Sequence, residues 1–282
     1  MKSKAFGWSG IPLPVIGQGT WRMGEARRQR RQEIAALRLG LDLGLVHVDT
    51  AEMYGDGGAE ELIAEVLRGR RRQDVFLASK VLPQHASHKG TIAAAEQSLR
   101  RLGTDYLDLY LLHWRGRHPL AETMGAMEEL IRQGKIRFLG VSNFDVDDLR
   151  AAMGALGRER LACNQVLYHL GARGIERELI PFCRQNGIAV VGYTPFGHLP
   201  AAGSAPGAVL LEIARRQGKT IRQVCLAFLT RQDNVFAIPK ASRSEHVLEN
   251  AGAANVELTA ADIEALDRTF PAPRRSTPLA TG

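Results

Sequence analysis

A chain of 282 residues is long enough to bury an extensive core, and it suits one large domain or two small ones. Its composition, 45% apolar and 24% charged, is that of an ordinary globular protein and excludes a largely disordered chain. The net charge of +7 is compatible with nucleic-acid binding, but the arginine clusters at 27–31 and 68–72 flank helical patterns without interleaved aromatic residues, so we expect no nucleic-acid partner.

The chain begins with a turn at Ser9-Gly10 between residues 6–8 and 11–15, which predicts an N-terminal β-hairpin. Eight short apolar runs rich in β-branched residues follow, each compatible with a buried strand. All but the first end at a polar or ionisable side chain. The predicted strand ends lie at Gly19, Asp49, Lys80, His113, Ser142, Gln165, Tyr193 and Lys240.

Amphipathic stretches between the runs predict crossover helices at 32–43, 59–67, 90–102, 120–132, 145–155 and 176–185. The longest interval holds two helical patterns, 208–217 and 221–229, and therefore predicts an extra helix before the last strand. Strands alternating with helices indicate an α/β protein with a parallel sheet, and the eightfold count favours a (β/α)8 TIM barrel. We expect one domain over 1–282, with an irregular tail at 271–282.

The chain shows no apolar run long enough for a signal sequence or a membrane span, so we expect no membrane partner and a cytoplasmic location. Its three isolated cysteines, Cys163, Cys183 and Cys225, fit reduced thiols in the same compartment. No heptad pattern indicates an oligomer, and we expect a monomer. His85 and His88 have a spacing that could bind a metal, but no third ligand accompanies them, so we expect no metal.

Active sites of (β/α)8 barrels lie at the C-terminal ends of the strands, where several loops converge. Taken singly, Asp49, Tyr54, Lys80 and His113 each have an ordinary structural explanation. As a set on three neighbouring strands they supply a carboxylate, a phenol, an ammonium and an imidazole around one cavity, which forms a coherent proton-donating system. His47, on the same face as Asp49, is expected to pack beneath this site.

The segments that carry these residues resemble the aldo-keto reductase family over nearly the whole chain and in the family's order. They are 44–51 with Tyr54, 78–80, 111–114, 140–144, 164–165, 193–195 and 238–240. Segments 50–54 and 165–171 are similar to the family's bacterial branch of methylglyoxal and small-aldehyde reductases.

This resemblance implies NADPH-dependent reduction of an aldehyde or ketone to an alcohol, with methylglyoxal, other small carbonyl compounds or keto-sugars as substrates. Tyr54 would act as the general acid, and Lys80 would favour its phenolate form and so lower its pKa. Asp49 would hold Lys80 in place, while His113 would orient the carbonyl by a hydrogen bond. The substrate pocket would be formed by Trp21, Tyr54, His113 and Trp114, with Phe196 as a further candidate.

A GxGxxG dinucleotide fingerprint is absent, and the nicotinamide contacts are implied by the resemblance. Lys240, Ser242 and Arg243 stand just before a helical pattern that begins near Ser244, where helix amides and basic side chains favour an anion such as a phosphate. Ser142, Asn143 and Gln165 would hold the nicotinamide carboxamide, and Tyr193 would stack on the ring. Further cofactor contacts would come from Gly19, Thr20, Trp21, Thr194 and Pro195. The adenosine half would contact Lys240, Ser242, Arg243, His246, Glu249 and Asn250. Ala241 and His246 replace a serine and an arginine common in the family, so NADH binding remains possible but weaker. Asn143 could alternatively cap the helix near Asp145.

Two other functions stay open. The barrel could be a cofactor-sensing, partner-binding subunit with little turnover, although no long N-terminal interaction segment precedes the hairpin. It could also be an isomerase or aldolase that uses Lys80 as a Schiff base, which would require Lys80 to lie in apolar surroundings without a carboxylate partner.

Overall fold

The computed structural model describes residues 1–281. An eight-stranded parallel sheet forms its centre, and every strand pairs with the next one along the chain. The strands are β3 Gln18–Gly19, β4 His47–Asp49, β5 Phe76–Val81, β6 Leu107–Leu112, β7 Ile136–Ser142, β8 Cys163–Leu167, β9 Ala189–Tyr193 and β10 Val235–Ala237.

Parallel bridges close this sheet into a barrel. Ile16 bridges Ala237, and Gly19 bridges Lys240. The Gly17 amide also donates to the Ala237 carbonyl at 2.8 Å. The eighth strand, β10, is three residues shorter than predicted, because Pro239 has no N–H to donate to the ladder.

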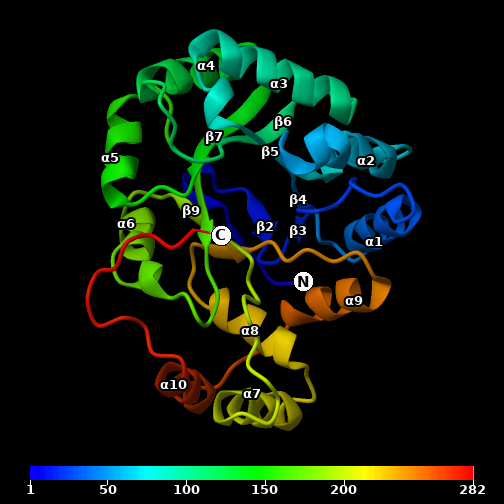
Figure 1. Cartoon of the computed structure of the whole chain (residues 1–282), viewed down its shortest axis with the longest axis vertical. Helices are drawn as coiled ribbons and strands as arrows, with labels where there is room; N and C mark the ends of the chain where they lie inside the picture. The colour runs from blue at the N-terminus through cyan, green and yellow to red at the C-terminus, as the bar shows by residue number, and fades with distance from the viewer. Residues whose placement is uncertain (282) are drawn as a thin grey trace.

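Helices surround the barrel as a ring (Figure 1). All eight predicted helices begin within three residues of the predicted position. The sixth, α6, begins at Leu179 and not at 176, because Gly174–Glu176 form a separate 3₁₀ turn. The extra helix is α7, which lies outside α8. The helices are α1 Arg30–Asp42, α2 Gly58–Leu67, α3 His88–Leu102, α4 Leu120–Arg132, α5 Val146–Gly154, α6 Leu179–Gln185, α7 Ala205–Arg216, α8 Ile221–Leu229, α9 Ser244–Ala253 and α10 Ala260–Thr269.

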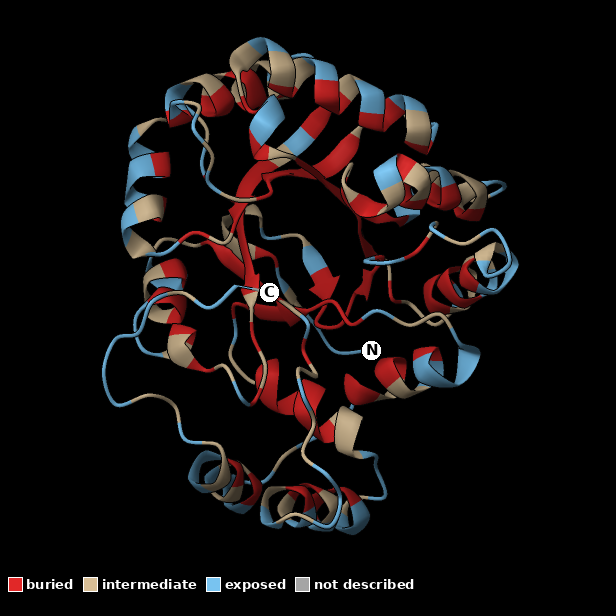
Figure 2. Ribbon diagram, viewed as in Figure 1, coloured by how far each residue is buried: buried red, intermediate tan, exposed pale blue. Residues whose placement is uncertain are grey.

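Burial explains why the strand sequences lack polar alternation. Every residue of β5 and β6 is buried, because one face of the sheet packs against helices and the other fills the barrel interior. Figure 2 shows most of the central sheet buried and most helices buried on their inner faces and exposed on their outer ones. Burying a polar side chain in such a strand costs free energy unless the side chain has a hydrogen-bonding or ionic partner. Asp49 and Lys80 are two charged residues buried in these strands, so each needs a partner.

The N-terminal hairpin covers the bottom of the barrel. Its strands are β1 Ser3–Ala5 and β2 Pro12–Pro14. The predicted first strand at 6–8 was wrong, since Gly7–Ser9 forms a 3₁₀ turn in which Gly7 has φ +55°. Phe6 is fully buried, and its ring lies 5.2 Å from that of Phe76 and 5.3 Å from that of Phe236. The hairpin thus plugs the end opposite the predicted site.

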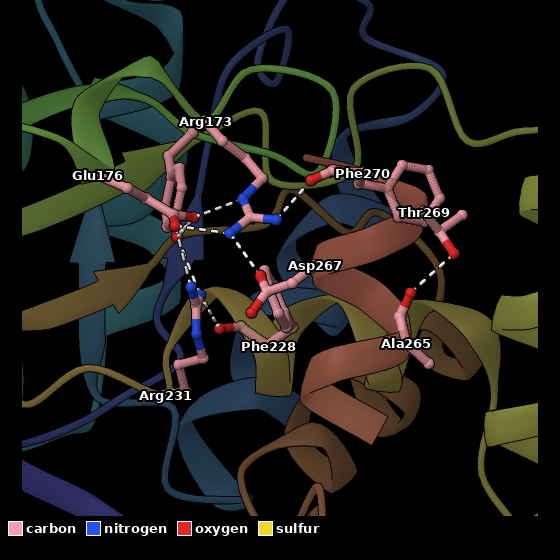
Figure 3. Close-up of polar contacts among 9 residues, drawn as sticks. Arg173, Glu176, Phe228, Arg231, Ala265, Asp267, Thr269 and Phe270 are labelled. Atoms are coloured by element: carbon pink, nitrogen blue, oxygen red, sulfur yellow. Dashed lines mark hydrogen bonds and ion pairs between the residues drawn. The ribbon is translucent and has the colours of Figure 1, made fainter. Parts of the chain in front are cut away.

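The sequence did not predict α10, which packs beside α7. The tail after Phe270 was expected to be irregular, and its described residues contain no helix or strand. A buried charge cluster attaches this end of the chain to the barrel (Figure 3). Arg173, in the loop after β8, donates to Glu176, to Asp267 of α10 and to the Phe270 carbonyl. Arg231, just after α8, donates to Glu176 at 3.0 Å.

The two arginine clusters contain several ion-paired members. Arg30 pairs with Glu65, Arg70 with Asp42, and Arg72 with Asp108. In the part of the chain that the structure describes, no helix combines the length and apolarity needed to cross a bilayer.

Candidate active site

A cavity of about 390 Å³ opens at the C-terminal ends of the strands, and we call it the mouth cavity. Asp49 reaches it from the end of β4, and Tyr54 from the short turn Tyr54–Gly57 that follows. Lys80 lies beneath it in β5, and His113 comes directly after β6. The structure therefore brings the four predicted catalytic residues together.

Lys80 is the centre of the polar contacts at this site. Its side chain is fully buried, and Nζ donates to Asp49 Oδ1 at 2.6 Å, to the Thr50 carbonyl at 2.8 Å and to Tyr54 Oη at 3.2 Å. Burial by itself lowers the pKa of Lys80, but the Asp49 carboxylate and the Tyr54 hydroxyl outweigh it, so the pKa is raised overall. Lys80 is thus a charged ammonium with all three donors used.

Tyr54 differs in one respect from the expectation. Burial raises the pKa of Tyr54, and Lys80 opposes this increase without reversing it, so the pKa lies above the ordinary tyrosine value. The prediction of a net lowering was wrong for the free protein because it omitted the burial of the phenol. Tyr54 is consequently protonated at neutral pH. Its ring packs edge-on against Trp21, at 5.0 Å between centroids.

His113 is an uncharged imidazole. Burial and then the nearby Lys80 charge lower its pKa to about 2. Its Nδ1 is buried, with no hydrogen-bond partner among residues 1–281. The ring lies 5.8 Å from Tyr54 and 4.8 Å from Trp114, so it shares one wall of the cavity with both.

Polar residues on the opposite wall are hydrogen-bonded to one another. Ser142 Oγ donates to the Gln165 carbonyl at 2.9 Å, and Tyr193 Oη donates to Asn143 Oδ1 at 2.8 Å. The Gln165 amide donates to Asp49 Oδ2 at 2.8 Å, which connects this wall to the Lys80 pair. The site is therefore one continuous polar network inside an apolar barrel.

Asn143 does not cap α5, which was the alternative considered for it. Asp145 is the N-cap, and its side chain accepts from the Asp148 amide. Asn143 has φ +60°, and its side-chain amide donates to the His113 carbonyl at 3.1 Å. Thr194 also has a positive φ, +50°. Such backbone strain concentrates at functional sites, and both residues line the mouth cavity.

Four further residues predicted to contact the cofactor, Gly19, Thr20, Trp21 and Pro195, also line the mouth cavity. A second cavity of about 330 Å³, the rim cavity, contains the residues predicted for the adenosine half: Lys240, Ser242, Arg243, His246, Glu249 and Asn250. Phe196 and Lys240 line both cavities. The two therefore adjoin at these side chains.

Sequence reasoning missed four of the lining residues. Met53, Gly197 and Ile238 line the mouth cavity, and each adjoins predicted residues in the sequence. Arg222 lines the rim cavity from α8, where no local motif marked it.

His47 packs beneath the site as expected. It is fully buried, its ring lies 5.4 Å from that of Phe76, and burial lowers its pKa to about 4. His85 and His88 face different carboxylates, Glu52 at 3.0 Å and Glu129 at 3.5 Å. Within residues 1–281, no cluster of three or more His, Cys, Asp or Glu side chains could hold a metal ion.

A Schiff-base role for Lys80 conflicts with these contacts. A nucleophilic lysine needs a lowered pKa and an accessible neutral amine. Lys80 instead has a raised pKa, and its ammonium is bonded to Asp49, Thr50 and Tyr54. The geometry suits a fixed positive charge beside a phenol that faces a cavity.

Comparison with known proteins decides the family. A family model described as the aldo/keto reductase family matches residues 15–270. The chain belongs to the aldo/keto reductase family. It is thus an oxidoreductase, and the resemblance read from its motifs is confirmed.

The relatives similar to this chain include proteins named as methylglyoxal and glyoxal reductases. The chain is 49% identical to methylglyoxal reductase YeaE of Escherichia coli strain K12, over 99% of each protein. It is 32% identical to a glyoxal reductase of Bacillus subtilis, over 92% of this chain and 90% of that one. A solved aldo/keto reductase from Klebsiella pneumoniae, in complex with NADP and acetate, is 45% identical with a TM-score of 0.93 over both full chains. The predicted barrel is therefore confirmed.

Proposed function

We propose that this chain reduces small reactive carbonyl compounds such as methylglyoxal to alcohols, using NADPH, with Tyr54 as the general acid. The observation that carries the proposal is the buried Lys80 ammonium, 3.2 Å from the hydroxyl of a tyrosine that lines the mouth cavity. The 49% identical relative named as a methylglyoxal reductase supports this substrate class.

The residues fit a dinucleotide that spans both cavities. The mouth cavity offers hydroxyl and amide groups from Ser142, Asn143 and Gln165 and the ring of Tyr193, which suit a carboxamide-bearing ring. The rim cavity offers Lys240 and Arg243, which suit a phosphate. When bound, NADPH would supply the hydride that reduces the carbonyl carbon.

The chain's own residues would handle the proton and the orientation. Tyr54, held protonated by burial, would give its proton to the carbonyl oxygen as negative charge develops there. Lys80 would then stabilise the resulting phenolate, and Asp49 would keep Lys80 charged. His113, neutral because of its lowered pKa, would donate one N–H to the same oxygen. Trp21, Trp114 and Phe196 would form the apolar walls around a small substrate.

The test is Tyr54→Phe, assayed by the absorbance of NADPH against methylglyoxal, aromatic aldehydes and keto-sugars. Loss of a general acid predicts turnover lower by roughly a hundredfold or more, with NADPH affinity unchanged by calorimetry. Tyr106→Phe is the matched control, because Tyr106 precedes β6 at the other end of the barrel and packs under Arg72. Unchanged turnover in Tyr54→Phe would exclude the general-acid role.

The same assay addresses the second candidate, a cofactor-sensing barrel subunit with little turnover. That function predicts tight NADPH binding and negligible oxidation of NADPH across the panel, in the unmodified chain as well as in Tyr54→Phe. We favour the reductase because all four members of the proton-donating group are present.

We also propose that residues 1–282 form one monomeric catalytic domain in the cytoplasm. The buried, unpaired thiols of Cys163, Cys183 and Cys225 support this location.

A further inference from the structure

The rim cavity contains an arginine that the sequence did not indicate. Arg222 comes from α8, whereas Lys240, Arg243 and His246 come from the segment that follows β10. The cavity also contains one carboxylate, that of Glu249. Any anion that enters must therefore overcome repulsion from Glu249, and the cationic side chains around it determine whether it can.

Arg222 is held against the cavity wall. It is the second residue of α8, and Thr220 and Gln223 form a capping box that fixes the first turn. The Gln223 amide also donates to the Glu249 carbonyl at 3.0 Å, which ties α8 to α9. The Arg222 guanidinium lies 4.5 Å from the centre of the Phe196 ring. Stacking and the fixed helix turn together keep this charge beside the cavity.

Glu249 is approached by both Arg222 and His246. Arg222 Nε lies 3.9 Å from Glu249 Oε2, and His246 Nδ1 lies 3.4 Å from the same oxygen. A guanidinium carries five N–H donors and a permanent charge, whereas a neutral imidazole carries one donor. Arg222 therefore contributes more than His246 both to offsetting the carboxylate and to contacting a phosphate. Its side chain is 40% exposed, so its remaining donors are accessible to a ligand.

We infer that Arg222 is a specificity-determining residue that favours NADPH over NADH by contacting the adenosine 2′-phosphate. The inference rests on the proposed function, which assigns the rim cavity to the adenosine half of the cofactor. In this chain the guanidinium is supplied by α8, whereas His246 belongs to α9. NADH has a hydroxyl in place of this phosphate, so it gains little from Arg222.

The test measures binding of 2′,5′-ADP and 5′-AMP by calorimetry, without any catalytic step. These probes differ only in the 2′-phosphate. We expect Arg222→Gln to weaken 2′,5′-ADP by roughly tenfold or more, the loss typical of one charge-assisted hydrogen bond, and 5′-AMP by about twofold or less. Arg222→Lys, which keeps the charge, should lie between. Arg268→Gln on α10 is the matched control, since Arg268 pairs with Glu264 and lines neither the mouth nor the rim cavity.

The outcomes separate this inference from the proposed function. If the unmodified chain prefers 2′,5′-ADP but Arg222→Gln retains its affinity, the role of Arg222 is excluded and the reductase proposal stands. An equal loss for both probes would place Arg222 at the adenine or the 5′-phosphate and would also exclude the 2′-phosphate role. If the unmodified chain bound neither 2′,5′-ADP nor NADPH, both proposals would fail.

Discussion

Replacing Arg173 with methionine tests whether the charge cluster at the end of the chain stabilises the barrel. Its side chain is only 4% exposed, and its guanidinium bonds to Glu176, to Asp267 and to the Phe270 carbonyl. These contacts join the loop after β8 to α10 and to the start of the tail (Figure 3). The substitution preserves most of the volume and removes the charge.

Removing one partner of a buried charge cluster usually costs about 3–5 kcal/mol, because the remaining charge is left uncompensated. Here the loss lies at the lower end, since Glu176 keeps its contacts with Arg231 and Tyr168. Asp267 is 46% exposed and can be hydrated again. We therefore expect a decrease of about 3 kcal/mol in the free energy of unfolding, or about 5 °C in Tm for a chain of this size.

Urea unfolding followed by far-UV circular dichroism measures this decrease. Arg268→Met is the control, because Arg268 is 66% exposed and its ion pair with Glu264 is expected to contribute under about 1 kcal/mol. Glu176→Gln should cost more than Arg173→Met, since it leaves Arg173 and Arg231 side by side without their shared carboxylate. The reasoning is refuted if Arg173→Met is no less stable than Arg268→Met.

Two further predictions concern pH and the cofactor. Burial lowers the pKa of His113 to about 2 and of His47 to about 4, so between about pH 6.5 and pH 5 each histidine takes up a proton in the unfolded chain but not in the folded one. The free energy of unfolding should therefore fall by up to about 1.4 kcal/mol per pH unit for each histidine as pH drops from about 6.5 to 5. His113→Asn should reduce this slope when unfolding is measured across the pH range. An unchanged slope would contradict the assignment of a buried, neutral His113. Arg243→Ala should raise the KM for NADPH far more than that for NADH; equal effects in steady-state assays would remove Arg243 from the phosphate site.

The sequence predicted the features that repeat along the chain. Alternating apolar runs and amphipathic stretches gave the strand and helix order, and the polar residues at the strand ends located Asp49, Lys80 and His113 at one end of the barrel. This worked because all parallel strands of a closed barrel point the same way, so their ends must converge.

Features that depend on packing between distant segments could not be predicted. Arg222 reaches the rim cavity only because α8 lies beside α9. The attachment of α10 depends on Arg173, almost a hundred positions earlier in the chain. The direction of the Tyr54 pKa shift was also missed, because the motif shows the neighbouring cation but not the degree of burial.

The raised pKa of Tyr54 agrees with a proton-donating role, because an acid must hold its proton until the reaction requires it. In the free protein the Asp49 carboxylate balances the Lys80 charge, and burial keeps the phenol neutral. If Tyr54 gives up its proton as proposed, the phenolate would form 3.2 Å from an ammonium that is already in place, so this charge would be stabilised without moving any group. In the proposed mechanism Lys80 would therefore act mainly on the product of proton transfer. Turnover of a Lys80 variant tests this role more directly than the pKa of Tyr54 in the free protein does.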